Sequence, residues 1–344
     1  MDPVPAAPAT PAPDDRKRLR KLLLRLVGSA LLLAALVAFV PWHLLADAFA
    51  RVSPMTFLAT LALFLGCHAF GSLKWRMVIA TAGARLPVRD AFRCYAAGLF
   101  SNIFLPSIVG GDVLRALLAG KKSGRLEAAI LGGAADRVLD LAAIGSLALG
   151  ASFFVGLAQD GAQRTLLLVG AGLALVGGLA GAALLLRRPL AKWPAKLRRR
   201  IAQALIALRR QSRRPGVLAF SFLGALAMQA ALVGLNALLA GGLELHAGPT
   251  AWLFAWSLAK LAGLAPIGFN GIGVRDGAFA FLMVPLLAAD GLSREELLAR
   301  ALAASLLWQA LLVVGSLLAG GVWALLKRGV AADSAPRTES LQHG

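Results

Sequence analysis

Residues 98–115 read GLFSNIFLPSIVGGDVLR, and residues 264–277 read LAPIGFNGIGVRDG. In both stretches a glycine follows a proline by five residues, and an arginine follows the same proline by nine. Each stretch interrupts an apolar segment, whereas an unbroken apolar segment of about 20 residues would cross a bilayer as one helix. A proline ends the incoming helix, and glycines permit left-handed turns. The sequence therefore predicts two broken helical elements.

We assign the hinges of the two elements to their prolines and glycines. The first element has Pro106, Gly110 and Gly111, and the second has Pro266, Gly268, Gly271 and Gly273. Beyond each hinge, a half-helix exposes free N–H groups and the positive end of its dipole. Together with an arginine, these features suit an anion such as a phosphate.

The charged residues beside the hinges are the first candidates for binding such an anion. They are Arg115 with Asp112, and Arg275 with Asp276. Asp112 would cap the half-helix or orient Arg115, which lies three residues further on. The alternative is that each aspartate–arginine pair only satisfies itself and pins a tight turn. Asn102 is a further candidate, which would hydrogen-bond either the broken backbone or a ligand.

A third charged group, Asp136, Arg137 and Asp140, lies inside a long apolar stretch. Asp136 and Asp140 are four residues apart and therefore share one face of a helix. Charges in such a position usually face the interior of a helix bundle or a cavity. Two interpretations stay open. The group is a self-neutralising structural triad, or Arg137 completes a basic cavity with Arg115 and Arg275.

The composition is typical of an integral membrane protein. Of the 344 residues, 58% are hydrophobic, against roughly 45–50% in soluble domains. The 36 Lys and Arg residues outnumber the 17 Asp and Glu residues, and they cluster beside apolar segments. This distribution indicates membrane topology and contact with anionic lipid, and we expect no nucleic-acid partner. The two cysteines and four histidines lack metal-ligand spacing, so we predict no metal site and no cofactor.

Six apolar stretches are predicted to be full transmembrane helices, at residues 22–40, 55–73, 128–157, 166–186, 217–240 and 302–326. For the first of them, a cleaved signal peptide is the competing interpretation. Basic stretches mark the cytoplasmic side at the N-terminus, 74–93, 121–125, 187–214 and 327–328. The two broken elements must then each leave and return on one side, entering from opposite faces.

We therefore predict an all-α integral membrane protein with six full transmembrane helices and two re-entrant hairpins in an inverted pseudo-repeat. The expected location is a bacterial inner membrane, with both termini in the cytoplasm. Residues 1–20 and 329–344 are predicted to be disordered cytoplasmic tails, and residues 21–328 the transmembrane domain. Within that domain, residues 187–214 carry eleven basic residues and no acid. They form either a plain cytoplasmic loop or an amphipathic helix on the anionic leaflet.

Other polar and aromatic residues carry weaker signals. Lys260 is either a headgroup contact or the partner of an acid elsewhere. Hydrogen bonds between helices are predicted for Gln229, Asn236 and Gln309, and interfacial aromatic belts for Trp42, Trp75 and Trp252.

Three runs of these residues resemble the signatures of a known family. The first is N-x-x-L-P at residues 102–106, followed by Gly111, Asp112 and Arg115. The second is D-R-x-x-D at residues 136–140, and the third is P-x-G-x-x-G-x-G-V-R-D at residues 266–276. Over roughly residues 20–328 the chain resembles the lysylphosphatidylglycerol synthase transmembrane-region family, also called flippase-like. It departs from the family at Asp276, where glutamate is commoner.

The resemblance implies an inner-membrane protein that moves or handles a lipid. In the full synthases this region flips aminoacylated phospholipid, which a separate soluble domain makes. No such domain is present in this sequence, so we expect a transporter of membrane lipids with an anionic or lipid-linked headgroup rather than an enzyme. The alternatives are an accessory or scaffold protein of a lipid, hopanoid or glycolipid pathway, and a membrane-embedded lipid-phosphate enzyme. A second copy of the chain and a lipid-synthesis enzyme are both open as protein partners.

Overall fold

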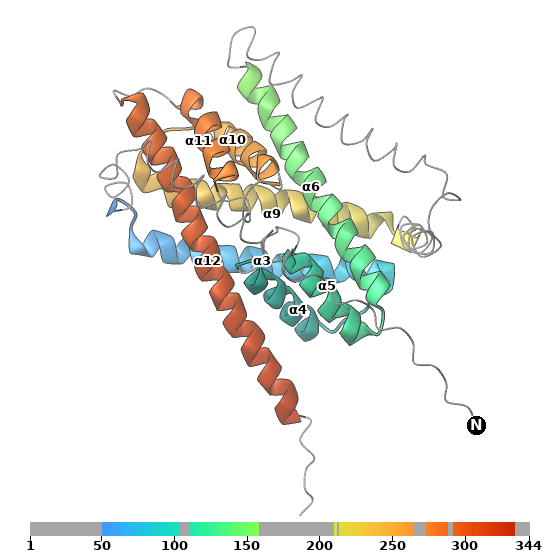
Figure 1. Cartoon of the computed structure of the whole chain (residues 1–344). Coiled ribbons are helices and arrows are strands. Elements are labelled where there is room, and N and C mark those ends of the chain that lie inside the picture. The colour runs from blue at the N-terminus through green and yellow to red at the C-terminus, as the bar shows by residue number, and fades with distance from the viewer. Residues whose placement is uncertain are drawn as a thin grey trace, which may run out of the picture.

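The computed structural model describes residues 50–103, 110–157, 210–211, 213–264, 273–287 and 292–333, of which residues 156–157 and 327–333 are described by their backbone only (Figure 1). Every regular element in these residues is helical, which confirms the predicted all-α class. The α-helices are α3 (Pro54–Ala82), α4 (Val88–Ser101), α5 (Gly110–Ser123), α6 (Leu126–Leu157), α9 (Pro215–Leu239), α10 (Pro249–Ala262), α11 (Val274–Met283) and α12 (Arg294–Asp333). Two 3₁₀ turns, η2 (Ala240–Leu243) and η3 (Val284–Leu286), follow α9 and α11.

Several predicted features lie outside the described residues. They are the spans at 22–40 and 166–186, the basic stretch 187–209, Trp42, and the hinge residues Pro106, Pro266, Gly268 and Gly271.

Four helices of the described part are long and apolar enough to cross a membrane: α3, α6, α9 with η2, and α12. They coincide with four of the six predicted spans. Two of them run further than expected. α3 ends at Ala82 rather than at residue 73, because the apolar run 77–80 continues the helix past Lys74. α12 begins at Arg294 and ends at Asp333, inside the stretch assigned to the C-terminal tail.

Each broken stretch forms two short helices that pack against each other: α4 with α5, and α10 with α11. The longest of them has 14 residues, or about 21 Å at 1.5 Å per residue. That length is less than the roughly 30 Å of a bilayer's hydrocarbon core. The interruptions predicted at the two proline–glycine stretches therefore separate helices too short to span a membrane individually.

Two of the predicted hinge glycines have identifiable structural roles. Gly273 precedes α11 with a φ of 84°, a left-handed conformation that favours glycine. Gly111 lies inside α5, and its φ is not positive. Its role is close approach, because a Cβ there would collide with the carbonyl oxygen of Gly98 and the side-chain oxygen of Asn102. Gly110 is the first residue of α5.

The long helices hold the two hairpins in place. α3 and α9 run side by side, and α6 packs against both of them and against α10 (Figure 1). α12 contacts α4 of the first hairpin and α11 of the second. In the view of Figure 1 the α10–α11 hairpin lies above the α3–α9 pair and the α4–α5 hairpin below it. Small buried residues, Ala299, Ala301, Ala303 and Ala304, allow α12 to pack closely.

Replacing Gly111 with alanine is expected to lower the free energy of unfolding by about 1–3 kcal/mol, because the added methyl group must push α4 and α5 apart. The control is Gly145→Ala in α6, where a Cβ meets no atom within 4 Å. It is expected to cause no loss. The unfolding of both variants is followed by denaturant titration in detergent micelles. Equal midpoints for the two variants would contradict the role of the Gly98–Gly111 approach.

Candidate functional site

A buried lysine connects α3 to α6. The Nζ atom of Lys74 donates to Asp136 Oδ1 at 2.6 Å and to Asp140 Oδ1 at 2.7 Å. The lysine and Asp136 side chains are each only 2% exposed. Both aspartates reach the same lysine, so the predicted placement of residues 136 and 140 on one helix face is confirmed.

Sequence reasoning missed Lys74 and placed it at the end of a span, as part of the basic cytoplasmic stretch 74–93. That assignment is wrong for Lys74, which lies inside α3 and is buried. Its two carboxylate partners stabilise the charge there, since an unpaired buried ammonium group is very costly.

The arginines of α5 and α6 join the same group. Arg115 Nη2 donates to Asp136 Oδ2 at 3.2 Å, and Arg115 Nε lies 3.2 Å from Asp112 Oδ1. Arg137 forms an ion pair with Asp112, and its Nη1 atom lies 3.5 Å from Asp140 Oδ2. We call these residues the central ion network: Lys74, Asp112, Arg115, Asp136, Arg137 and Asp140. The structure thus brings together five of the predicted site residues and adds Lys74.

The two arginines of the network differ in accessibility. Arg115 is 4% exposed, and its guanidinium lies over the rings of Trp75 and Tyr95 at 5.1 and 5.0 Å. The side chain of Arg137 is 41% exposed. Neither Nε atom makes a hydrogen bond within the described residues. Arg115 is therefore buried and held by its ring and carboxylate contacts, whereas Arg137 is the more accessible of the two arginines.

The prediction of interfacial belts for Trp75 and Trp252 is wrong. Both side chains are buried within the protein, at 0% and 5% exposure. Trp75 packs against Arg115 and Tyr95, and Trp252 against Phe279.

The second hairpin holds its arginine in a closed arrangement. Arg275 donates to Asp276 Oδ1 through Nη2 at 2.7 Å and to Gln309 Oε1 at 2.9 Å. Asp276 also accepts from Gly273 N at 3.0 Å and from the hydroxyl of Ser305 on α12. Asp276 thereby caps α11, which corresponds to the alternative in which the aspartate–arginine pair pins a turn.

The polar amides act as predicted in two of three places. Gln309 connects α12 to Arg275, and Gln229 on α9 accepts from Lys260 Nζ at 2.7 Å. Asn236 is buried, and its amide atoms have no hydrogen-bond partner within the described residues. Asn102 Oδ1 accepts from Gly111 N at 3.1 Å, so this asparagine supports the backbone of the first hairpin.

Lys260 lies on α10, the helix of the second hairpin that packs against α6. Its Nζ atom donates to the neutral amide of Gln229 rather than to an acid. It interacts electrostatically with Arg275 of its own hairpin and with Arg137 and Asp140 of α6. We call the region of Lys260, Arg275, Arg137 and Asp140 the polar centre, because these charges act on one another there.

Replacing Lys74 with methionine is expected to lower the free energy of unfolding by about 3 kcal/mol or more, because two carboxylates lose their buried counter-charge. The double variant Lys74→Met/Asp136→Asn should recover part of this loss. Lys121→Met, at an exposed lysine of α5, is the matched control and should change little. Denaturant titration in micelles measures all three. The network is not stabilising in the stated way if Lys74→Met and Lys121→Met unfold at the same midpoint.

The comparisons with known proteins agree with the sequence motifs. A search of curated proteins found no match to the chain. The model of the Lysylphosphatidylglycerol synthase TM region matches residues 22–320, which include both hairpins and the central ion network. This match covers well over half of the 344 residues. The chain therefore belongs to the lysylphosphatidylglycerol synthase TM region family, and it is a membrane protein of lipid metabolism or transport.

Proposed function

We propose that this chain is a lipid flippase of the bacterial inner membrane, which carries an anionic or lipid-linked headgroup past the polar centre between its two hairpins. The observation that carries the proposal is the position of Lys260, which is bonded to an amide and lies within electrostatic range of Arg137 and Arg275. An anionic headgroup at this place would gain charge-assisted hydrogen bonds from these cations.

The acids of the centre have a separate role in this proposal. Asp136 and Asp140 hold Lys74, and Asp112 holds Arg115 and Arg137. A lipid phosphate would compete with Asp112 for the accessible Arg137, while the buried Arg115 keeps its carboxylate partners. Binding and release then need only the contacts of Arg137 with Asp112 and Asp140 to exchange. No covalent change of the lipid is part of the proposal.

The proposal also includes a membrane topology. The α4–α5 and α10–α11 hairpins would enter from opposite leaflets as an inverted pseudo-repeat, within six full crossings and with both termini in the cytoplasm. Two observations support this topology. The hairpin helices are short, and basic stretches lie on either side of the α4–α5 hairpin.

The topology predicts that single cysteines at positions 93 and 121 react from the same side of the membrane. The variants are Arg93→Cys and Lys121→Cys, in a background with Cys67 and Cys94 replaced by alanine. Labelling of right-side-out and inverted vesicles with a membrane-impermeant maleimide measures their accessibility. Reaction of the two cysteines from opposite sides would rule out the re-entrant hairpin.

The proposed transport activity predicts a specific loss when the positive charge of Lys260 or Arg137 is removed. Lys260→Gln and Arg137→Gln should each slow the flipping of a fluorescent phosphatidylglycerol in proteoliposomes about tenfold or more, since a hydrogen bond to a charged group contributes about 1.5–3 kcal/mol. Lys121→Gln, which removes an exposed charge from α5, should flip at the wild-type rate. Lipid composition should stay unchanged during incubation with the protein in detergent.

Two results would contradict this proposal. Wild-type proteoliposomes that flip no faster than protein-free ones would favour an accessory or scaffold protein. Altered lipid chemistry in detergent would favour a membrane enzyme.

A further inference from the structure

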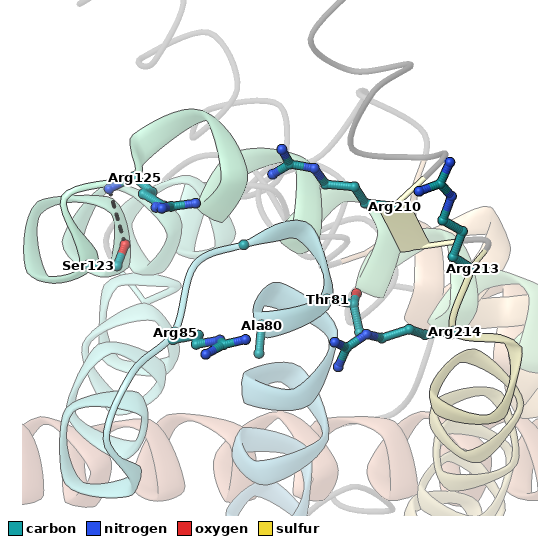
Figure 2. Close-up of a pocket in the computed structure, with 9 residues that line it drawn as sticks. Ala80, Thr81, Arg85, Ser123, Arg125, Arg210, Arg213 and Arg214 are labelled. Atoms are coloured by element: carbon teal, nitrogen blue, oxygen red, sulfur yellow. Dashed lines mark hydrogen bonds between the residues drawn. The ribbon is translucent and has the colours of Figure 1, made fainter.

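A second polar site lies at one end of the helix bundle, where α3 and α5 end and α6 and α9 begin. It is a pocket of about 590 Å³ (Figure 2). Five of its nine lining residues are arginines: Arg85, Arg125, Arg210, Arg213 and Arg214. They come from three segments, namely the α3–α4 connection, the α5–α6 connection and the residues before α9. We call it the arginine pocket.

The arginines converge on the C-terminal cap of α3. Gly83 caps this helix in a left-handed conformation with a φ of 113°. A Cβ added at Gly83 would lie 3.4 Å from Arg125 Nη1 and 3.7 Å from Arg210 Nη1. Two guanidinium groups from distant segments therefore meet beside one backbone position. Figure 2 shows Arg125 and Arg210 facing each other across the pocket, with Arg85 and Arg214 facing each other below them.

The described lining of the pocket is positively charged, and none of its nine residues is acidic. No described carboxylate lies within 4.0 Å of the five arginines. Like charges at this spacing repel each other, and an anion between them would turn repulsion into attraction. The hydroxyl of Ser123 accepts from Arg125 N at 3.3 Å and keeps its own proton free to donate.

The chemistry of the lining residues suits a phosphate group. The planar fork of a guanidinium binds two phosphate oxygens at once, and several forks around one concavity can share the three or four oxygens of such a group. Single arginines scattered on a convex surface would only hold a diffuse cloud of anions.

The pocket is separate from the central ion network. Thr81, which lines it, lies seven residues after Lys74 on α3, or about 10 Å along the helix axis. Three helices that are long enough to span the membrane, α3, α6 and α9, begin or end at the pocket. Its depth is therefore that of lipid headgroups at the membrane surface and not that of the bilayer centre.

We propose that the arginine pocket is a second, surface-level binding site for a phosphate group. The phosphate is presented by an anionic lipid of the adjacent leaflet or by a soluble phosphorylated compound. The site stands independently of transport, because none of its residues belongs to the central ion network. A bound phosphate would connect the α3–α4 connection, the α5–α6 connection and the start of α9 through their arginines.

The test compares two variants that remove the same charge from the same end of the molecule. Arg125→Gln/Arg210→Gln removes the pair beside Gly83. Arg93→Gln/Lys121→Gln removes two cations that do not line the pocket. The purified full chain is delipidated in a neutral detergent. Native mass spectrometry then measures the binding of phosphatidylglycerol against phosphatidylcholine, and a thermal-shift titration measures the binding of inorganic pyrophosphate.

The wild type should bind at least one of the two phosphate probes, and Arg125→Gln/Arg210→Gln should weaken that binding at least tenfold. Arg93→Gln/Lys121→Gln should stay within about twofold of the wild type. Loss of phosphatidylglycerol binding alone would identify a lipid headgroup as the source of the phosphate, and loss of pyrophosphate binding would identify a soluble compound. Equal losses in the two variants, or none in either, would overturn the proposal.

A second pair of substitutions distinguishes a loss of phosphate binding from a folding defect. If Arg125→Gln/Arg210→Gln unfolds at a lower temperature than the wild type without any ligand, Arg85→Gln/Arg214→Gln replaces it under the same criterion. Arg125→Lys/Arg210→Lys keeps the charge and removes the fork geometry. Its affinity should fall between those of the wild type and the glutamine variant, whereas wild-type affinity would show that only net charge matters and would count against a built phosphate site.

Discussion

The ammonium group of Lys74 lies among three helices, and its two carboxylate partners come from α6. Lipid tails are as apolar as leucine, so transmembrane helices gain little from the hydrophobic effect when they associate. Packing and polar contacts must hold them together instead. Asp136 shares its other oxygen with Arg115 of α5, so a single carboxylate connects α3, α5 and α6. This contact connects α5 of the first hairpin to the long helices α3 and α6.

Much of the fold follows from local sequence patterns. Proline and glycine interrupt the two apolar stretches where α4 gives way to α5 and α10 to α11, and the spacing of Asp136 and Asp140 places both on one helix face. Lys74 was missed because its partners lie 62 and 66 residues away, and a lysine near the end of an apolar run resembles an interfacial charge. The apolar residues 77–80 after Lys74 were the sequence signal that the helix continues past it. The Gln229–Lys260 bond is likewise long-range.

The two aspartate–arginine pairs look alike in sequence and differ in the structure. Asp276 neighbours Arg275 directly, and α12 closes the arrangement through Ser305 and Gln309. Asp112 instead divides its interactions between Arg115 and the accessible Arg137. The arginine of the second hairpin is thus enclosed by α12, while Asp112 of the first hairpin is paired with a partly exposed arginine. This difference depends on residues of α6 and α12 that lie outside both motifs, so the motifs alone did not reveal it.

In the proposed flippase, the charges around Lys260 would determine which headgroup charge is balanced. The formal charges of Lys74, Arg115 and Arg137 equal those of Asp112, Asp136 and Asp140, and Arg275 balances Asp276. Among these described groups Lys260 is the surplus cation. In that proposed function a headgroup with a single negative charge would make the centre electroneutral. A dianion would leave one negative charge unmatched, which a proton or metal cation carried with it would balance. The charge of the lipid would then be linked to the number of accompanying ions.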